Sequence, residues 1–171
     1  MLNLPNQLKL RKFTKKDITK EYLRILNNKK LLEFSDQRHT RHTYQSCLKY
    51  LKSFEKNENL FLKLVFNREL IGTCTIYIDK NNQNANIGFL IGNQNKHNKG
   101  YATIILKYLI KYLFQIKKLN KISCGTIDKN YPMIKVCKKN KMSLEAILKK
   151  EKKIKKKFYN VVIYSIFNKK K

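Results

Sequence analysis

The sequence predicts a mixed α/β domain with a central, mostly antiparallel sheet flanked by helices. Short runs rich in β-branched and aromatic residues alternate along the chain with amphipathic helical stripes. Two of these runs surround a short polar turn, which indicates an antiparallel hairpin. The chain has 171 residues, of which 42% are apolar, so it can bury a core. We expect a single domain over residues 1–171, with a basic tail at 168–171.

Each expected element has a local signal. Thr14 followed by an acid at Asp17 is a variant of the capping box and favours a helix that ends at Asn27-Asn28. Thr43 can cap a second helix, and Pro132 suits the first turn of a later one. In chain order we expect a strand at 8–13, helices from Thr14 and from Thr43, a hairpin of strands at 58–66 and 70–78, a strand at 85–92, a long helix at 101–114, a strand at 121–127, a helix near Pro132, and strands at 142–151 and 158–167.

The charge is strongly positive: 39 Lys and Arg against 11 Asp and Glu give a formal net charge of +28. Clustered cations suit phosphate binding. However, only five of the cations are arginine, the residue that base readout favours, and no nucleic-acid motif is present. Abundant Lys, Asn and Ile are also what the codons of an AT-rich genome produce. We therefore expect no nucleic-acid partner, and a basic surface that attracts anionic small molecules and repels polycations.

Cysteine spacing and hydropathy bear on metals and membranes. Cys47, Cys74, Cys124 and Cys137 contain no C-x-x-C pair, which argues against a zinc site or a disulfide framework, and we expect no bound metal. The start, MLNLPNQLKL, lacks the apolar core of a signal peptide, and the run YLIKYLFQI is broken by Lys111. We expect a cytoplasmic protein without membrane contact, as a monomer or homodimer.

A polar loop, NQNKHNKG, joins the expected strand at 85–92 to the long helix. The amides at a helix N-terminus and the helix dipole attract anions, above all a pyrophosphate. Gly100 lets the backbone approach such a guest, and the small Ala102 keeps a side chain away from it. The loop matches neither a Walker P-loop nor a Rossmann fingerprint. On this reasoning alone, a phosphate-bearing cofactor and an ordinary strand–helix turn both stay open.

Four segments, in order, resemble the GNAT N-acetyltransferases. HNKGYA, residues 97–102, is similar to that family's coenzyme-A loop, [Q/R]-x-x-G-x-[G/A]. Downstream, NYPMIKVCKKNKM resembles its N-x-x-A-x-x-x-Y-E-K-x-G-F segment. Upstream, LIGTCTIYI and ANIGFLIG resemble its pre-loop strand pair. The similarity covers nearly the whole chain and is greatest to the branch with ribosomal-protein-alanine and spermidine acetyltransferases.

The resemblance implies acetyl-CoA as cofactor and direct attack of a substrate amine on its thioester. Backbone groups of the pre-loop strand would contact the pantetheine arm, the loop would hold the pyrophosphate, and one asparagine would border the arm. The residues so implied are Phe89, Leu90, Ile91, Lys96, His97, Asn98, Lys99, Gly100, Tyr101, Ala102, Thr103 and Asn130.

Departures from the family pattern leave the catalytic groups open. Cys137 stands where many relatives have a tyrosine that protonates the leaving thiolate, and Asn86 stands where several have a glutamate base. Lys141-Met142 replaces Gly-Phe, and His97 replaces Gln or Arg. The candidates for acid–base work are His42, His39, Asn86 through a water, Tyr159 and Cys137, with Asp36 and Glu33 as nearby acids. The histidines can equally be surface residues before a helix cap, Tyr159 a sheet-face residue, and Cys137 a packing residue.

The acceptor is expected to be a primary amine on a small anionic molecule, such as a nucleotide-linked amino sugar. Only Asp36 and Glu33 are acids near the suspected acceptor segment, too few to hold a polycation, whereas Gln37 and Arg38 suit an anion. Two alternatives remain: an N-terminal acetyltransferase of a ribosomal protein, and a non-catalytic basic nucleic-acid or ribosome-binding module on the same fold.

Overall fold

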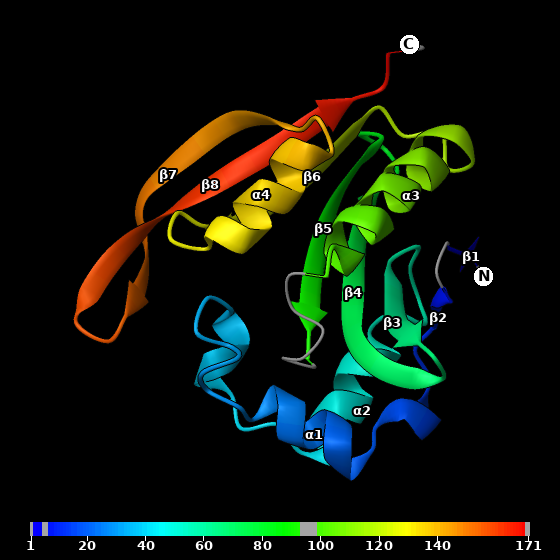
Figure 1. Ribbon diagram of the computed structural model, residues 1–171, viewed down its shortest axis with the longest axis vertical. Helices are drawn as coiled ribbons and strands as arrows, with labels where there is room; N and C mark the ends of the chain where they lie inside the picture. Colours follow the sequence, from blue (N-terminus) through cyan, green and yellow to red (C-terminus); the bar gives the residue numbers. More distant parts are fainter. Residues whose placement is uncertain (1, 5–6, 93–98, 170–171) are drawn as a thin grey trace. The chain divides into compact units, whose positions relative to one another are not determined.

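The computed structural model describes residues 2–4, 7–92 and 99–169 (Figure 1). Within them, eight strands are hydrogen-bonded in the order β1-β2-β3-β4-β5-β6-β8-β7. The strands are β1 (Leu2–Asn3), β2 (Leu8–Lys12), β3 (Leu60–Phe66), β4 (Glu69–Asp79), β5 (Asn84–Ile91), β6 (Lys121–Ile127), β7 (Ser143–Ile154) and β8 (Lys157–Phe167). The helices are α1 (Lys20–Leu26), α2 (Tyr44–Lys52), α3 (Tyr101–Gln115) and α4 (Tyr131–Lys139), with 3₁₀ turns at Lys15–Asp17 and Asp36–His39.

The predicted fold class is confirmed. The β1/β2, β2/β3, β6/β8 and β7/β8 ladders are antiparallel, and β5/β6 is parallel, with Asn86 opposite Ser123. By its contacts the chain divides into two compact units, Met1–Thr75 with Phe89–His97 and Ile76–Gly88 with Asn98–Lys171. Strands β4 and β5 contribute residues to both. No helix in the described part of the chain has the length and apolar content needed to cross a bilayer.

In the first unit, α1 and α2 pack through an aromatic cluster on the sheet. The ring of Phe13, which follows β2, lies 4.9 Å from that of Tyr22 in α1 and 4.5 Å from that of Phe61 in β3. Phe54, just past α2, stacks on Phe61 at 5.4 Å. Phe13, Tyr22, Phe54 and Phe61 are all buried. Such contacts between large rings fix the helices on the strands, because each ring removes a large apolar area from water.

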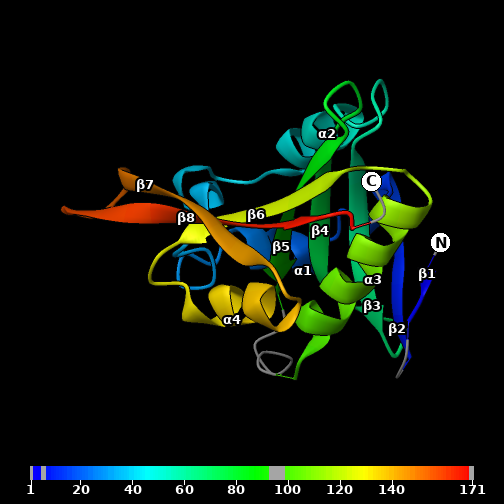
Figure 2. The ribbon, with the colours of Figure 1, turned by 90° about the horizontal axis from the view of Figure 1, so that it is seen from above.

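In the second unit, α3 and α4 lie side by side on the same face of the strands (Figures 1 and 2). Four residues of α3 at helical spacing, Ile105, Leu106, Leu109 and Leu113, are completely buried. Asn140, at the end of α4, donates a hydrogen bond of 3.2 Å to the carbonyl of Thr103 in the first turn of α3. This contact ties the end of one helix to the beginning of the other.

One sequence prediction about the elements is wrong, and one strand was missed. The helix expected from Thr14 is divided: Asp17 accepts hydrogen bonds from both the backbone N–H and the hydroxyl of Thr14, but this box closes only a 3₁₀ turn. Helix α1 starts later, with Thr19 accepting from the amide of Tyr22 at 3.1 Å. The two-residue β1 carries no periodicity by which it could be recognised.

Candidate active site

The segment between α1 and α2, residues 28–42, is built from local polar contacts. Asn28 accepts from the amides of Lys30 and Leu31, both at 3.1 Å. Ser35 then accepts from the amide of Gln37 at 3.3 Å and so starts the 3₁₀ turn Asp36–His39. Short polar side chains favour such turns, because they bond to the backbone only a few residues away. We call this segment the 28–42 loop.

The loop and the end of α1 enclose a cavity of about 320 Å³. Three cationic side chains, those of Lys29, Arg38 and Arg41, line it together with His39. Among the described residues, no Asp or Glu lines it. A concave site with convergent charges of one sign concentrates ligands of the other sign. The lining residues of this pocket, which we call the loop pocket, are Leu26, Asn27, Lys29, Leu32, Gln37, Arg38, His39, Thr40 and Arg41. The predicted substrate residues Gln37 and Arg38 therefore both line this pocket.

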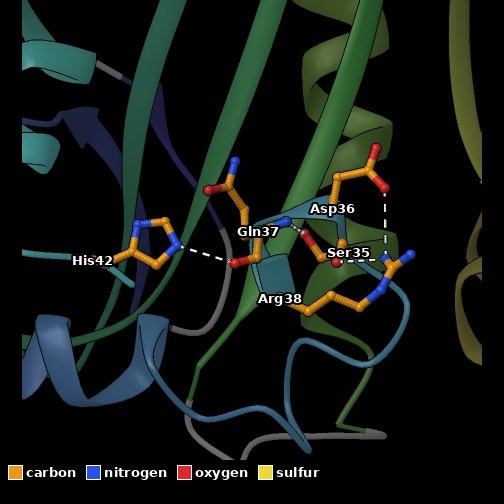
Figure 3. Close-up of polar contacts among 5 residues, drawn as sticks. All are labelled: Ser35, Asp36, Gln37, Arg38 and His42. Atoms are coloured by element: carbon orange, nitrogen blue, oxygen red, sulfur yellow. Dashed lines mark hydrogen bonds and ion pairs between the residues drawn. The ribbon is translucent and has the colours of Figure 1, made fainter. Parts of the chain in front are cut away.

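Arg38 is the most buried of these cations. Its side chain is only 10% exposed, and one guanidinium nitrogen donates to the carbonyl of Ser35 at 2.7 Å (Figure 3). The same nitrogen lies 3.5 Å from a carboxylate oxygen of Asp36, a long and mostly exposed contact. The Ser35 carbonyl thus fixes the fork of the guanidinium at the pocket wall. A planar, buried guanidinium suits bidentate recognition of phosphate or carboxylate.

The two candidate histidines differ in their surroundings. His39 is exposed and lines the loop pocket. His42 is half-buried, and its Nε2 lies 3.3 Å from the carbonyl of Gln37 (Figure 3). Because a carbonyl only accepts, this contact requires a proton on Nε2, and Nδ1 is then the basic nitrogen of the neutral ring.

The end of β5 packs against α1 within the first unit. A Cβ added to Gly92, directly after β5, would lie 2.6 Å from Cγ2 and 2.8 Å from Cδ1 of Ile25, so only glycine allows this approach. Leu90 packs against the core cluster that contains Tyr22 and Leu26. Leu26 also lines the loop pocket. The predicted pantetheine strand, Phe89–Ile91, and the loop pocket therefore border the same turn of α1.

In the second unit, the start of α3 fits a phosphate-bearing cofactor. Gly100, the N-cap residue, has φ of 80°, and no described atom lies within 4 Å of a Cβ built on it. The first helical turn, which contains Tyr101, Ala102 and Thr103, carries no acid. First-turn amides of a helix have no intrahelical partner, so open backbone here is suited to an anion. Lys99 is exposed, and the predicted residues Lys96, His97 and Asn98 lie outside the described part of the chain.

The remaining predicted residues also belong to the second unit. Asn130 caps α4: it accepts from the amide of Met133 at 3.4 Å and donates to the hydroxyl of Thr126 at 2.9 Å. Asn86 is exposed on β5, and Tyr159 is half-buried on β8, opposite Lys152. The sequence prediction for Asn130 did not include this capping role, although its position before Tyr131-Pro132 is typical of one.

Cys137 is completely buried in α4, as expected for a packing residue. A hydrogen bond with the thiol of Cys124 lowers the pKa of Cys137, although burial opposes that shift. Burial raises the pKa of Cys74, a cysteine with no such bond to another thiol. Within the described residues no cluster of three or more His, Cys, Asp and Glu side chains could hold a metal ion.

Among the polar residues of the pocket wall, sequence reasoning missed Asn27, Lys29 and Thr40. Asn27 could be recognised only as a helix terminator, and Lys29 only as one lysine among many. Their positions around the pocket depend on how the 28–42 loop folds back on itself, which no local pattern reveals.

Comparison with solved structures supports the fold over nearly the full chain. RimL, a ribosomal L7/L12 α-N-protein acetyltransferase in complex with coenzyme A, superposes with a TM-score of 0.87, at 16% identity over 96% of each chain. Spermidine N-acetyltransferase from Vibrio cholerae, in complex with CoA and spermine, gives 0.83 at 18% identity over 94% of this chain and 95% of that one. MccE, the microcin C7 self-immunity acetyltransferase in complex with acetyl-CoA and AMP, gives 0.83 at 20% identity over 95% and 93%.

Sequence comparison identifies the family. A curated relative, the uncharacterized N-acetyltransferase p20 of Bacillus licheniformis, is 33% identical over 99 residues, which are 57% of this chain. The match spans about half of that relative's length, 55%. The family profile described as "Acetyltransferase (GNAT) domain" matches residues 7–143. The chain therefore carries a GNAT acetyltransferase domain and belongs to that family, as its loop and strand motifs predict.

Proposed function

We propose that this protein transfers an acetyl group from acetyl-CoA to the primary amine of a small anionic molecule, such as a nucleotide-linked amino sugar. The observation that carries the proposal is the loop pocket, where Lys29, Arg38 and Arg41 line a cavity without a described acid in its wall. A phosphate or carboxylate on the acceptor would gain charge-assisted hydrogen bonds there. A polycation would meet like charge.

The position of the pocket supports an acceptor rather than a remote ligand. Helix α1 touches the end of β5 through Ile25 and Gly92, and its next residues, Leu26 and Asn27, line the pocket. The family resemblance assigns the thioester to that end of β5. An acceptor held by its anionic part in the loop pocket would present its amine from the same unit, which is the positioning that amine attack requires.

Bound acetyl-CoA would supply the activated acetyl group, and the chain must supply amine binding, proton removal and charge stabilisation. We propose His39, which lines the loop pocket, or His42, through Nδ1, as the group that accepts the amine's proton. Asn86, Tyr159 and Cys137 remain candidates from the second unit. Backbone amides of Phe89–Ile91 are proposed to bind the pantetheine arm and thioester, and those of the first turn of α3 to bind the pyrophosphate.

The structural neighbours supply acceptors to test. MccE was solved in complex with acetyl-CoA and AMP, which recommends amines carrying a nucleotide. RimL is a ribosomal-protein acetyltransferase, so an N-terminal peptide is the second acceptor to test. The spermidine enzyme was solved with spermine, a polycation that the loop pocket of this chain does not suit.

Replacing Arg38 with Ala tests the proposal, with Arg24→Ala as the matched control. Arg24 is in α1 of the same unit, and its side chain is 78% exposed. It pairs with Glu21 at 2.7 Å and does not line the pocket. In an acetyl-CoA consumption assay, Arg38→Ala should raise the KM of an anionic amine about tenfold or more, since it removes a buried charged donor. The KM of acetyl-CoA should stay unchanged, and Arg24→Ala should behave as wild type.

Two results would contradict the proposal. Equal acceptor KM values in wild type and Arg38→Ala would remove the pocket from acceptor binding. An absence of turnover on every nucleotide sugar, polyamine, aminoglycoside and N-terminal peptide, combined with salt-dependent RNA or duplex binding, would favour the non-catalytic nucleic-acid module instead.

A further inference from the structure

Asn27 links the two ends of the 28–42 loop through its side-chain amide. Its Nδ2 donates to the carbonyl of Leu23 at 2.8 Å, inside α1, and to the carbonyl of His42 at 2.9 Å, directly before α2. Its Oδ1 accepts from the amide of His42, also at 2.9 Å. One amide therefore uses both of its donors and its acceptor, and two of the three bonds reach a residue fifteen positions away.

The linked residue stands at a point where the loop must be fixed. His42 precedes Thr43, whose hydroxyl caps α2 by accepting from the amide of Ser46 at 3.2 Å. The ring of His42 in turn contacts the carbonyl of Gln37, in the 3₁₀ turn beside Arg38. The paired bonds of Asn27 to His42 thus join the C-terminus of α1 to the N-terminus of α2 and close the loop at its neck.

The pocket depends on this closure. All of its lining residues belong either to the end of α1 or to the loop itself. The hydrogen bonds of Asn28, of Ser35 and of the His42 ring to Gln37 run between residues no more than five positions apart and shape the turns of the loop. The bonds of Asn27 to the backbone of His42 connect its two ends. Without the link, the cationic wall of Lys29, Arg38 and Arg41 would lose its fixed spacing, and pre-organised charges bind an anion better than mobile ones do.

We infer that Asn27 is a positioning residue for acceptor binding: through its paired hydrogen bonds to His42 it holds the 28–42 loop in the form that recognises the anionic group. This inference rests on the proposed function for the identity of the ligand. Asn27 also borders the pocket, but its side-chain amide is engaged by Leu23 and His42, so it acts through the loop rather than by holding the ligand.

The chain offers a matched control in Asn57. This asparagine is also exposed, follows the other helix of the unit, and uses its amide in the same way: Nδ2 donates to the carbonyl of Ser53 at 2.7 Å, and Oδ1 accepts from the amide of Asn59 at 3.0 Å. Its contacts are local, and it does not line the loop pocket. Asn57→Ala therefore matches the loss of helix-end hydrogen bonds without opening the loop.

The experiment compares wild type, Asn27→Ala and Asn57→Ala in two ways. Hydrogen exchange by NMR reports the His42 amide, which should lose protection about tenfold in Asn27→Ala alone. In the second measurement, inorganic phosphate is titrated in the presence of saturating coenzyme A, which fills the cofactor's own phosphate site. The NMR signals of the His39 and His42 rings report phosphate binding. Phosphate affinity should fall about three- to tenfold in Asn27→Ala and stay at the wild-type value in Asn57→Ala. The KM of a transferred amine should rise by a similar factor, without a change in the KM of acetyl-CoA.

The possible failures are distinguishable. Unchanged His42 protection in Asn27→Ala would refute the link itself. Lost protection with unchanged acceptor KM, or an equal rise of that KM in Asn57→Ala, would refute the positioning role. If wild type shows no phosphate response at its histidines, the anionic acceptor is refuted, while His42 protection and the KM of whichever amine is transferred still decide the role of Asn27.

Discussion

In the proposed function, Arg38 is the residue on which the choice of acceptor depends most directly, because its side chain is only 10% exposed and a hydrogen bond holds its guanidinium in place. The carbonyl of Ser35 fixes its orientation, and the lining cations Lys29 and Arg41 add charge of the same sign. A lysine at position 38 would keep the charge but not the planar fork, so it would not be a conservative replacement. On this proposal, selectivity for anions at the pocket depends on one positioned side chain supported by its neighbours.

Gly100→Glu should abolish saturable acetyl-CoA binding in calorimetry. The left-handed φ of 80° costs a side-chain-bearing residue about 1–2 kcal/mol, and the new carboxylate would stand at the helix terminus that is suited to phosphate. Gly100→Gln separates the two effects, because it has the same size and backbone strain without the charge. It should bind more weakly than wild type but measurably. Wild-type affinity in a folded Gly100→Glu protein would refute the loop assignment.

Cys137→Ala should retain most of the turnover, since the thiol, on α4, is completely buried and is expected only to pack. The lost packing should lower the free energy of unfolding by about 1–2 kcal/mol. Cys74→Ala, at another buried cysteine, is the matched control and should show a similar loss. A fall in kcat of several hundredfold in Cys137→Ala, with stability no lower than that of Cys74→Ala, would make Cys137 the general acid.

At the scale of single residues, the sequence indicates which side chains suit an anion better than it indicates which side chains bond to one another. Gln37 and Arg38 were predicted to suit an anion, and both line the pocket. Asn27 could not be assigned, because its partner His42 is fifteen residues away and the pairing exists only once the loop is closed. The capping role of Asn130 is typical of its place before Tyr131-Pro132, whereas the family resemblance implies only a contact with the cofactor.

At the scale of elements, a partly buried ion pair fixes the 3₁₀ turn after β2 onto β3. The ammonium of Lys63 lies 2.5 Å from a carboxylate oxygen of Asp17, with side chains 21% and 14% exposed. Burial of Asp17 opposes its ionisation, but hydrogen bonds from Lys63 and Thr14 outweigh burial and lower the pKa of the carboxyl. The turn therefore leads the chain into α1 through a contact that depends on a charged Asp17.

Asp17→Asn should lower the free energy of unfolding by about 1–2 kcal/mol at neutral pH, because it leaves Lys63 without its charged acceptor. A lowered pKa in the folded protein means that the stabilisation is present above the usual carboxyl range and is lost as pH falls through the folded-state value. The difference from wild type should therefore shrink below about pH 4 in denaturant titrations. Glu21→Gln, at an exposed pair, should show little change at any pH; a pH-independent deficit in Asp17→Asn would contradict this account.

The elements themselves were largely predictable, since their signals are local. The helix at 101–114 and the strand at 121–127 agree with α3 and β6 almost to the residue, because apolar periodicity and flanking turns mark both. The hairpin turn is equally local: Asn67 and Arg68 both have positive φ, as a two-residue turn between twisted strands requires. The prediction of one continuous helix from Thr14 was wrong because a capping box specifies where a helix starts but not how far it continues. Thr19 caps a second helix five residues later.

At the scale of the whole molecule, the net charge of +28 should favour anionic over cationic ligands. Much of it is lysine spread along the chain, which a codon bias alone would produce. The loop pocket differs in that its cations converge on one cavity and include a buried arginine. The general charge should therefore raise association rates with any anion in a salt-dependent manner, whereas Arg38 should determine which anionic amine is held.

The most direct test of the account is the ratio of kcat/KM for three amines in one acetyl-CoA consumption assay: a nucleotide-diphosphate amino sugar, the same amino sugar without its nucleotide, and spermidine. The proposed pocket predicts the highest value for the nucleotide-linked amine, at least about tenfold above the other two, since only it offers phosphates to Arg38. The advantage should disappear in Arg38→Ala. Spermidine turning over faster than every nucleotide sugar tested would contradict the central claim.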